Sequence, residues 1–258
     1  MKTPQAHTVF TDYVAKFHDE RPGITEAILS RSKSARGLSP YQWLLESLPL
    51  DQPMLDLACG SSPLAGQARS TYVGIDRSRG ELTLARGQLE GSEAGMVIQG
   101  NAVSLPFGDS HFESIACSMA MMVLTPLEEI FGELARVATP TGNLALLLPA
   151  RTPLNAEDLW WYGATKIATG ALRFATPPSG GTTRIVDVAA THGFTVRSRM
   201  RERFELCIDS EEVADLIVHS WYLPTTTSSQ AHRAKRVLRL ATGRSLGIPL
   251  ERITMSRR

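Results

Sequence analysis

The chain has 258 residues, of which 43% are hydrophobic and 21% are charged, and its formal net charge is +1. This composition is typical of a globular enzyme, excludes a disordered or fibrous chain, and gives no whole-molecule argument for a polyanionic partner. Three cysteines without disulfide or metal-ligand spacing favour a reducing compartment. The N-terminus lacks the apolar run of a signal peptide, and no apolar stretch approaches the roughly 20 residues that cross a bilayer. We therefore expect a cytoplasmic protein, a monomer or homodimer, with no metal and no membrane segment.

The first 50 residues are predicted to form amphipathic helices. Apolar residues recur at helical spacing over 24–28 and 41–48. A break rich in Ser, Gly and Arg separates the two groups at Arg31–Pro40. We assign residues 1–50 to an N-terminal helical lid.

Short apolar runs alternate with helical stretches over residues 51–150. This alternation indicates βαβ units, since parallel neighbouring strands need a crossover connection. The predicted strands are Met54–Cys59, Tyr72–Asp76, Met96–Gln99, Ser114–Ser118 and Asn143–Pro149. The predicted helices are one beginning at Leu64–Arg69, one over Ser78–Leu89 with Ser78 as N-cap, and one over Leu127–Ala138. We assign residues 51–150 to a cofactor-binding core.

Residues 151–181 interrupt the alternation and are predicted to form an inserted helical cap. Residues 182–258 then complete the core and add further helices. Their predicted elements are helices Thr183–His192, Glu211–Trp221 and Gln230–Leu240, and strands Phe194–Arg203 and Ile248–Met255. The expected fold is α/β: a Rossmann-like, seven-stranded, mostly parallel sheet with helices on both faces.

Charge is distributed unevenly along the chain. Residues 51–180 carry 8 Lys and Arg against 13 Asp and Glu, whereas residues 181–258 carry 13 against 8. Alternating arginines at positions 197, 199, 201 and 203 should share one face of a strand. They form either a solvated strand face, or the rim of a pocket or an anion site.

Polar residues follow the first two predicted strands. Ligands of open α/β sheets bind beyond the carboxyl ends of the strands, where strand order reverses. The segment Asp56–Pro63 joins the first strand to the next helix, and its small residues let backbone amides approach a ligand. Asp76 ends the second strand, where a carboxylate can accept hydrogen bonds from both hydroxyls of a ribose. Asp76 alone would equally suit a helix N-cap or a solvated position, but with the loop it indicates a nucleoside-containing cofactor.

Two further motifs make the pattern specific: Gln99–Phe107, followed by Asp109–Ile115, and Arg136–Gly142. The four motifs in this order resemble class I S-adenosylmethionine-dependent methyltransferases, particularly the branch of ubiquinone and menaquinone C-methyltransferases. That branch carries a D-L-x-C-G-x-G-like loop, a strand ending in G-x-D, a G-D-A-x-x-L-P-F segment and an R-V-L-x-P-G-G segment. The resemblance covers about residues 50–150 and implies S-adenosylmethionine as the cofactor.

The resemblance also assigns roles to residues. It implies that the loop shapes the site for the methionine part of the cofactor, that Asp76 binds the ribose, and that the residues after the second and third strands lie at the adenine. The residues after the fourth strand would line the side of methyl transfer. The predicted cofactor-binding residues are Asp56, Ala58, Cys59, Gly60, Asp76, Arg77, Asn101, Ala102, Ser118 and Met119.

The chain departs from the family pattern at three positions. Ala58 and Ser62 replace glycines, which predicts a looser approach of the loop to the ligand. Asn101 replaces an acidic residue, and its amide oxygen can still accept from the adenine amino group without contributing charge. A nicotinamide-dependent enzyme is rejected, because it would present G-x-G-x-x-G and the loop has only Gly60 and, farther on, Gly66.

In this fold the N-terminal helices and the segment after the fifth strand roof the acceptor pocket. His18 is the predicted catalytic base, with an ordinary surface or core histidine as the alternative. A base is useful for a hydroxyl or an acidic carbon and optional for an amine. For the tryptophan pair of the cap, plain packing is the alternative to acceptor binding. The predicted acceptor-binding residues are Tyr13, Phe17, Arg21, Trp160 and Trp161.

The tail shows a second, weaker resemblance. Phe204–Ser210, followed by an acidic helix, is similar to the C-terminal half of bacterial large-subunit rRNA guanine-N1 methyltransferases, which implies that Ile248–Met255 is strand seven. Those enzymes carry an N-terminal four-ligand zinc module, and the first 58 residues here contain no cysteine. With a net charge near zero, this favours a small-molecule acceptor over nucleic acid. An rRNA base methyltransferase and a non-catalytic relative that binds the cofactor or a partner remain as alternatives.

Overall fold

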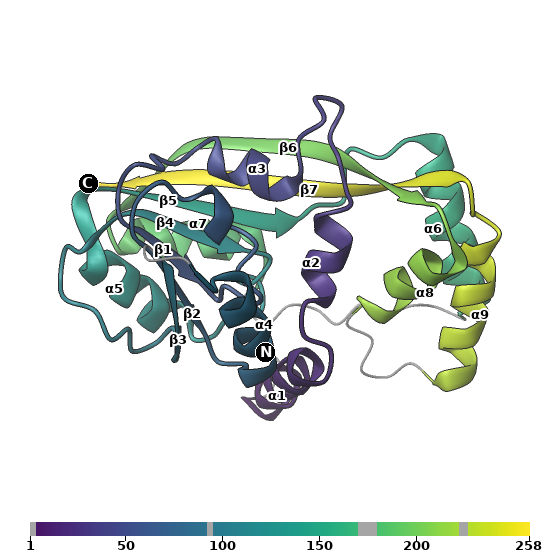
Figure 1. Ribbon diagram of the computed structural model, residues 1–258, viewed down its shortest axis with the longest axis horizontal. Coiled ribbons are helices and arrows are strands. Elements are labelled where there is room, and N and C mark those ends of the chain that lie inside the picture. Colours follow the sequence, from purple (N-terminus) through teal and green to yellow (C-terminus); the bar gives the residue numbers. More distant parts are fainter. Residues whose placement is uncertain (1–3, 92–94, 170–179, 222–226) are drawn as a thin grey trace.

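The computed structural model describes residues 4–91, 95–169, 180–221 and 227–258, whose arrangement Figure 1 shows. Among these residues no helix combines the length and apolarity needed to span a lipid bilayer. The end of the predicted cap, residues 170–179, and part of the linker before the last helix, residues 222–226, lie outside the described residues.

One seven-stranded sheet forms the centre of the protein, in the order β3-β2-β1-β4-β5-β7-β6. The strand pairs from β3 across to β5 are parallel, whereas β7 runs antiparallel to both β5 and β6. Strand order reverses between β1 and β4, which is where such sheets bind ligands. The strands are β1 (Met54–Leu57), β2 (Tyr72–Asp76), β3 (Gly95–Gln99), β4 (Phe112–Ser118), β5 (Ala138–Pro149), β6 (Phe194–Ile208) and β7 (Arg244–Arg257). The predicted Rossmann-like, mostly parallel sheet is confirmed, with β7 as the late strand.

Helices cover both faces of this sheet. Several begin at side-chain caps that the sequence supplies: Ser39, Asn155 and Thr227 each form a capping box, and the Ser78 hydroxyl accepts from the backbone N–H of Glu81, as predicted. The helices are α1 (Pro4–Glu20), α2 (Ile24–Leu29), α3 (Pro40–Leu45), α4 (Arg79–Gln88), α5 (Leu127–Val137), α6 (Ala156–Ala168), α7 (Thr182–Thr191), α8 (Glu211–His219) and α9 (Ser228–Arg239).

Two buried clusters hold the helices against the sheet. Successive residues of a strand point to opposite faces, so Leu55 and Leu57 of β1 join one cluster and Met54 joins the other. The cluster with Leu55 and Leu57 includes apolar residues of α5 and α7, and the cluster with Met54 includes residues of α3, α8 and α9. The central strands are therefore buried on both sides, as their continuous apolar runs predict.

The prediction that a helix begins at Leu64–Arg69 is wrong. The chain forms only a single 3₁₀ turn there, η1 (Ala65–Gln67). Gly66 lies in the middle of this turn, and the backbone N–H of Arg69 donates to the carbonyl of Leu50 at 2.9 Å, which directs the chain straight toward β2. The loop after β1 is therefore followed by a tight turn and not by a long helix.

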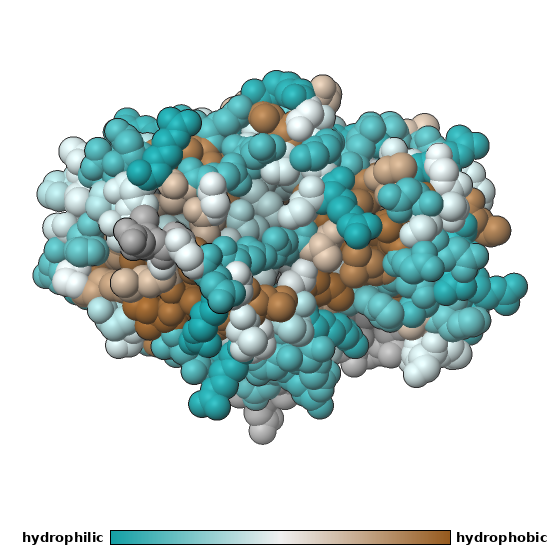
Figure 2. Space-filling model, viewed as in Figure 1, coloured by the Kyte–Doolittle hydropathy of each residue, from teal (hydrophilic) through white to brown (hydrophobic). Residues whose placement is uncertain are grey.

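Strands β6 and β7 are longer than predicted. Their pairing continues along the whole length of both strands, from Phe194 with Arg257 to Ile208 with Arg244. Figure 1 shows both strands running from the core to α6, α8 and α9 at their far end, while α1 lies next to α4 and α2 lies between α4 and α8. In Figure 2 this face is largely hydrophilic, with apolar side chains gathered between α2 and the α6–α8 region.

A buried carboxylate attaches α6 to the long strands. Asp158 accepts from Nε and Nη2 of Arg203 at 2.6 and 2.9 Å, and from the backbone N–H groups of Gly247 and Asn155 at 2.6 and 3.0 Å. Burial raises the pKa of Asp158, but the Arg203 guanidinium and the N–H donors outweigh burial and leave the pKa below its usual value. The four donors satisfy a carboxylate that has no exposure to solvent.

Three of the four alternating arginines of β6 face carboxylates of the protein itself, and Nε of Arg197 donates to the Ser256 hydroxyl at 2.7 Å. Nε of Arg199 and Nε of Arg201 lie 2.6 and 3.0 Å from Oε1 of Glu251, a buried residue of β7. The Arg199 and Arg201 side chains are about half exposed, whereas Arg203 is turned to Asp158. This arrangement agrees with the solvated strand face and not with the rim of an external anion site.

Candidate cofactor site

A cavity of about 360 Å³ lies at the carboxyl ends of β1, β2 and β4, with residues of α1, α2 and α3 on its other side. This is the point where strand order reverses, and the volume falls in the usual range of about 300–1,000 Å³ for small-molecule sites. The predicted cofactor residues all line this one cavity: Asp56, Ala58, Cys59, Gly60, Asp76, Arg77, Asn101, Ala102, Ser118 and Met119.

The loop after β1 turns through three left-handed residues. The backbone φ is 55° at Ala58, 53° at Gly60 and 64° at Ser62. This region favours glycine, because a Cβ crowds the backbone there. Ala58 and Ser62 nevertheless hold the conformation expected for the glycines that they replace, so the loop keeps a tight path.

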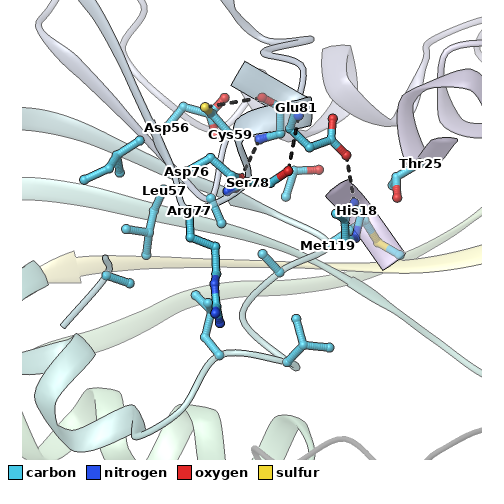
Figure 3. A pocket seen from close by; sticks show the side chains of 18 of the residues that line it. His18, Thr25, Asp56, Leu57, Cys59, Asp76, Arg77, Ser78, Glu81 and Met119 are labelled. Atoms are coloured by element: carbon cyan, nitrogen blue, oxygen red, sulfur yellow. Dashed lines mark hydrogen bonds and ion pairs between the residues drawn. The ribbon is translucent and has the colours of Figure 1, made fainter. Parts of the chain in front are cut away.

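Asp76 lies at the end of β2 and joins the loop to α4. Its Oδ2 accepts from the backbone N–H of Gly60 at 2.9 Å, and its Oδ1 accepts from that of Ser78 at 2.8 Å. Burial raises the pKa of Asp76, and these two hydrogen bonds oppose that shift. Each oxygen retains a further lone pair, so the fixed carboxylate can accept two more hydrogen bonds from the cavity side (Figure 3).

Asp56 lies at the base of the cavity on β1. Its Oδ2 accepts from the Tyr72 hydroxyl at 2.7 Å, whereas its Oδ1 is buried and has no hydrogen-bond partner among the described residues. Burial raises the pKa of Asp56 to about 7, the Tyr72 hydrogen bond opposes this, and the Asp76 carboxylate adds to it. The Ser118 hydroxyl, at the end of β4, is likewise buried and unpartnered within the described part of the chain. Buried polar atoms are normally hydrogen-bonded, so these two atoms fit a polar ligand in the cavity.

Cys59 is a buried residue of the same loop, 5% exposed. Burial raises the pKa of its thiol well above the ordinary value, and the nearby Asp56 carboxylate raises it further. A thiol held in its neutral form is a poor nucleophile. Cys59 therefore acts as a small side chain that lets the loop pack on β2.

A buried carboxylate of α4 is hydrogen-bonded to two segments of the lid. Oε1 of Glu81 lies 2.7 Å from Nδ1 of His18 in α1, and Oε2 accepts from the backbone N–H of Gly23 at 2.8 Å (Figure 3). The Ser78 hydroxyl also donates to Asp19 at 2.6 Å. Glu81 is 3% exposed, so both of its oxygens are committed to the lid. These contacts fix His18 at the wall of the cavity.

The remaining predicted cofactor residues differ in exposure. Arg77 and Asn101 are exposed at the cavity mouth, and the Asn101 side-chain oxygen accepts from the backbone N–H of Val103 at 3.3 Å. Ala102 is partly buried beside them. Met119 follows β4 with a left-handed φ of 56°, a conformation that turns the chain sharply at the cavity.

The predicted acceptor residues do not line this cavity. Tyr13, Phe17 and Arg21 lie on the opposite side of α1, where they line a second cavity. Trp160 and Trp161 lie on α6, with their rings stacked at a centroid distance of 5.9 Å. Trp160 is 65% exposed, and Trp161 packs against the cluster of α3, α8 and α9. Of the lid residues singled out in the sequence, the structure places His18 at the cofactor cavity.

Two acidic residues of the cavity were not predicted. Glu81 stands three residues after Ser78, in the S-x-x-E pattern of a capping box, so the sequence offered a purely helical role for it. Its side chain instead faces the lid. Glu26, in α2, is hydrogen-bonded to the Ser61 hydroxyl of the cofactor loop and to Gln88 of α4. No local pattern marks that contact, because it joins segments 35 residues or more apart.

Comparisons with known proteins agree with this geometry. Residues 55–146 match a family model described as a methyltransferase domain. An uncharacterized methyltransferase of Synechocystis sp. is 35% identical over 114 residues, covering 42% of this chain and 52% of that protein. A demethylmenaquinone methyltransferase of Desulfitobacterium hafniense is 29% identical over 120 residues, covering 42% of this chain and 47% of that protein. The chain thus spans about half the length of these curated relatives.

Solved structures share the fold over most of the chain. The [4+2]-cyclase SpnF superposes with a TM-score of 0.56 at 16% identity, over 84% of this chain and 79% of that one. Geranyl diphosphate C-methyltransferase from Streptomyces coelicolor, solved with S-adenosyl-L-homocysteine, superposes with a TM-score of 0.52 at 13% identity and the same coverages. Residues 55–146 thus match a methyltransferase domain, and the similarity to S-adenosylmethionine-dependent methyltransferases that the sequence predicts is confirmed.

Proposed function

We propose that the protein transfers a methyl group from S-adenosylmethionine to a small-molecule acceptor. The observation that carries this proposal is the convergence of the loop after β1, Asp76 and the segments after β3 and β4 on one cavity. The family match over residues 55–146 and the methyltransferase names of the relatives support it.

The charges around the cavity suit this cofactor. Among the described residues, the cavity is lined by four carboxylates and one guanidinium, which belong to Glu26, Asp56, Asp76, Glu81 and Arg77. S-adenosylmethionine carries a sulfonium and an ammonium group besides one carboxylate, so it is a net cation that an acidic cavity attracts. The unpartnered Oδ1 of Asp56 would accept from the ammonium group, and Asp76 would accept from the ribose hydroxyls.

Isothermal titration calorimetry with S-adenosylmethionine and with S-adenosylhomocysteine tests the cofactor. We expect both ligands to bind at one site per chain. The neutral thioether of the second ligand removes the positive sulfonium, and the difference between the two affinities measures the acidic field of the cavity. No detectable binding of either ligand at millimolar concentration would show that the assignment is wrong.

His18 is the candidate catalytic base of this reaction, with Glu81 as its positioning residue. Bound S-adenosylmethionine would supply an electrophilic methyl group, and the electron pair of the broken S–C bond would stay on sulfur. As a lone pair of the acceptor forms the new bond to the methyl carbon, His18 would take the acceptor proton. The Glu81 carboxylate at Nδ1 would orient the ring and stabilise the imidazolium that forms. This arrangement favours a protic oxygen or carbon acceptor over an amine.

Release of S-adenosylhomocysteine in the presence of a panel of phenols, hydroquinones and amines tests this role. We expect H18Q to lower kcat by about 10²–10⁴-fold, the usual effect of a general base, and E81Q to lower it less. The affinity for S-adenosylhomocysteine, measured in parallel, separates loss of chemistry from loss of the cofactor. Unchanged kcat and pH profile in H18Q would show that His18 only holds the lid.

The structure gives little support to the two alternative functions that the sequence left open. An RNA substrate would need an uncompensated basic surface, but Arg199, Arg201 and Arg203 of β6 face Glu251 and Asp158. The alternative of a non-catalytic relative rests on the departures from the family pattern at Ala58, Ser62 and Asn101, and the backbone at the first two keeps the left-handed path. We place the protein in a reducing cytoplasm, which the three free cysteines support.

A further inference from the structure

A second cavity, of about 570 Å³, lies between the end of α1 and the described residues 218–221 and 227–235 of the α8–α9 side. Helix α1 separates the two cavities. Val14, Ala15 and His18 line the cofactor cavity, whereas Tyr13 and Phe17 line the second one. Residues four apart share one face of a helix, so two different faces of α1 serve two different spaces.

Two cations converge on the second cavity beside a histidine. Arg21 follows α1 and Lys235 belongs to α9, while His219 ends α8, and all three line the cavity. Nζ of Lys235 lies 2.8 Å from Nε2 of His219. Burial lowers the pKa of His219, and the charges of Lys235 and Arg21 lower it further, so both cations act on the same point. Clustered like charges repel one another, and a bound anion would relieve that repulsion.

The carboxylates near this cluster are mostly engaged elsewhere. Asp215 lies 3.6 Å from Nζ of Lys235, but the Arg239 guanidinium binds it with two hydrogen bonds of 2.8 and 2.9 Å. Glu20 lines the cavity and lies 3.6 Å from Nζ of Lys16. The charges of Arg21 and Lys235 are therefore only partly compensated.

An aromatic wall lies next to the positive groups. The Phe17 ring is 6.1 Å from the Tyr13 ring, and the guanidinium carbon of Arg21 lies 4.8 Å above the Phe17 centroid. Trp221 and Val218 line the cavity from the α8 side. The cavity thus offers an apolar surface beside a positive end, which complements an amphipathic anion.

We propose that the second cavity binds a small organic anion with an aromatic or aliphatic body and one carboxylate, sulfonate or phosphate group. The charged group would sit between Arg21 and Lys235, and the body would lie against Tyr13 and Trp221, which are partly exposed. This site does not depend on methyl transfer, since it lies across α1 from the cofactor cavity.

Fluorescence titration with 8-anilinonaphthalene-1-sulfonate tests the proposal. We expect R21Q and K235Q each to raise the dissociation constant at least about tenfold, the effect of one lost charge-assisted hydrogen bond. The matched control is R86Q, which removes an exposed arginine of α4, and it should leave the constant unchanged. The uncharged analogue N-phenyl-1-naphthylamine should bind more weakly than the sulfonate. Saturating S-adenosylhomocysteine should not displace the probe.

Three results would overturn the proposal. They are equal affinity of the probe for R21Q, K235Q and R86Q, equal affinity of the charged and uncharged probes, and displacement by S-adenosylhomocysteine. The first two would mean non-specific apolar binding, and the third would place the probe in the cofactor cavity. Thermal unfolding midpoints close to that of the unaltered protein would show that the variants are folded.

Discussion

Replacing Asp76 by alanine is the most informative perturbation of the cofactor cavity. The carboxylate already accepts from the backbone N–H groups of Gly60 and Ser78, and its remaining lone pairs would accept from the two ribose hydroxyls. Hydrogen bonds to charged groups are worth about 1.5–3 kcal/mol. We therefore expect D76A to weaken binding of S-adenosylhomocysteine by about that amount, or roughly 10- to 150-fold in the dissociation constant.

Loss of affinity alone would not separate contact with the ribose from support of the loop. Calorimetry with S-adenosylhomocysteine and its 2′,3′-dideoxy analogue, against both proteins, forms a cycle that separates them. The unaltered protein should discriminate between the two ligands, and D76A should not. The control D109A removes an exposed carboxylate that is paired with Arg136, away from the cavity, and should leave both affinities unchanged. Equal weakening of both ligands by D76A would refute the ribose contact and leave Asp76 as a support of the loop.

Three further predictions concern stability. D158A leaves the buried donors around α6 without their acceptor and should lower the free energy of unfolding, measured in urea titrations, by about 3–5 kcal/mol. The control D109A breaks an exposed ion pair and should lower it by less than about 1 kcal/mol. Equal losses in the two variants would contradict the role of burial. Because burial raises the pKa of Asp56 to about 7, above its unfolded value of about 3.9, its contribution to stability is fully present below pH 4 and is lost as pH rises through 7. Thermal midpoints of the unliganded protein between pH 4 and 8 should therefore show a downward component that D56N lacks, and identical profiles would rule it out. G80A places a Cβ 2.9 Å from a backbone oxygen of the lid and should destabilise the protein by about 1–3 kcal/mol. G87A, on the same helix with open space around it, should be neutral or slightly stabilising. Similar thermal midpoints for the two variants would show that the lid does not pack tightly against α4.

The cofactor side of the cavity could be predicted because its determinants are local. A strand, a turn of small residues and a carboxylate at the next strand end can each be recognised over a few residues, and parallel pairing brings the strand ends together. The same cavity is therefore lined by Asp56, Asp76 and Asn101, although the prediction did not depend on any contact between them. The replacements at 58 and 62 suggested a looser loop, but the rest of the motif imposes the backbone path.

The acceptor side could not be predicted in the same way, because it depends on where helices pack. The sequence does not show which face of α1 meets which cavity. Phe17 and His18 are adjacent in sequence, yet they line two different cavities. The position of Trp160 depends on how far β6 extends beyond the core. Charged residues on the solvated face of β6 make the end of this strand hard to recognise in the sequence, because its length is determined by pairing with β7. The role of Glu81 was hidden for a similar reason, since its partners belong to the lid.

The position of β7 inside the sheet has a consequence for biosynthesis. It is the last of the seven strands to leave the ribosome, yet it lies between β5 and β6 and pairs with both. Until it emerges, β5 and β6 each present an open hydrogen-bonding edge, the kind of surface that recruits other strands. The parallel part of the sheet, from β3 to β5, can form during translation. Helices α6, α8 and α9, which lie at the far end of β6 and β7, can take their final positions only after β7 has emerged. A nascent chain stalled before Arg244 would expose two unpaired edges and is where we expect chaperone dependence to be greatest.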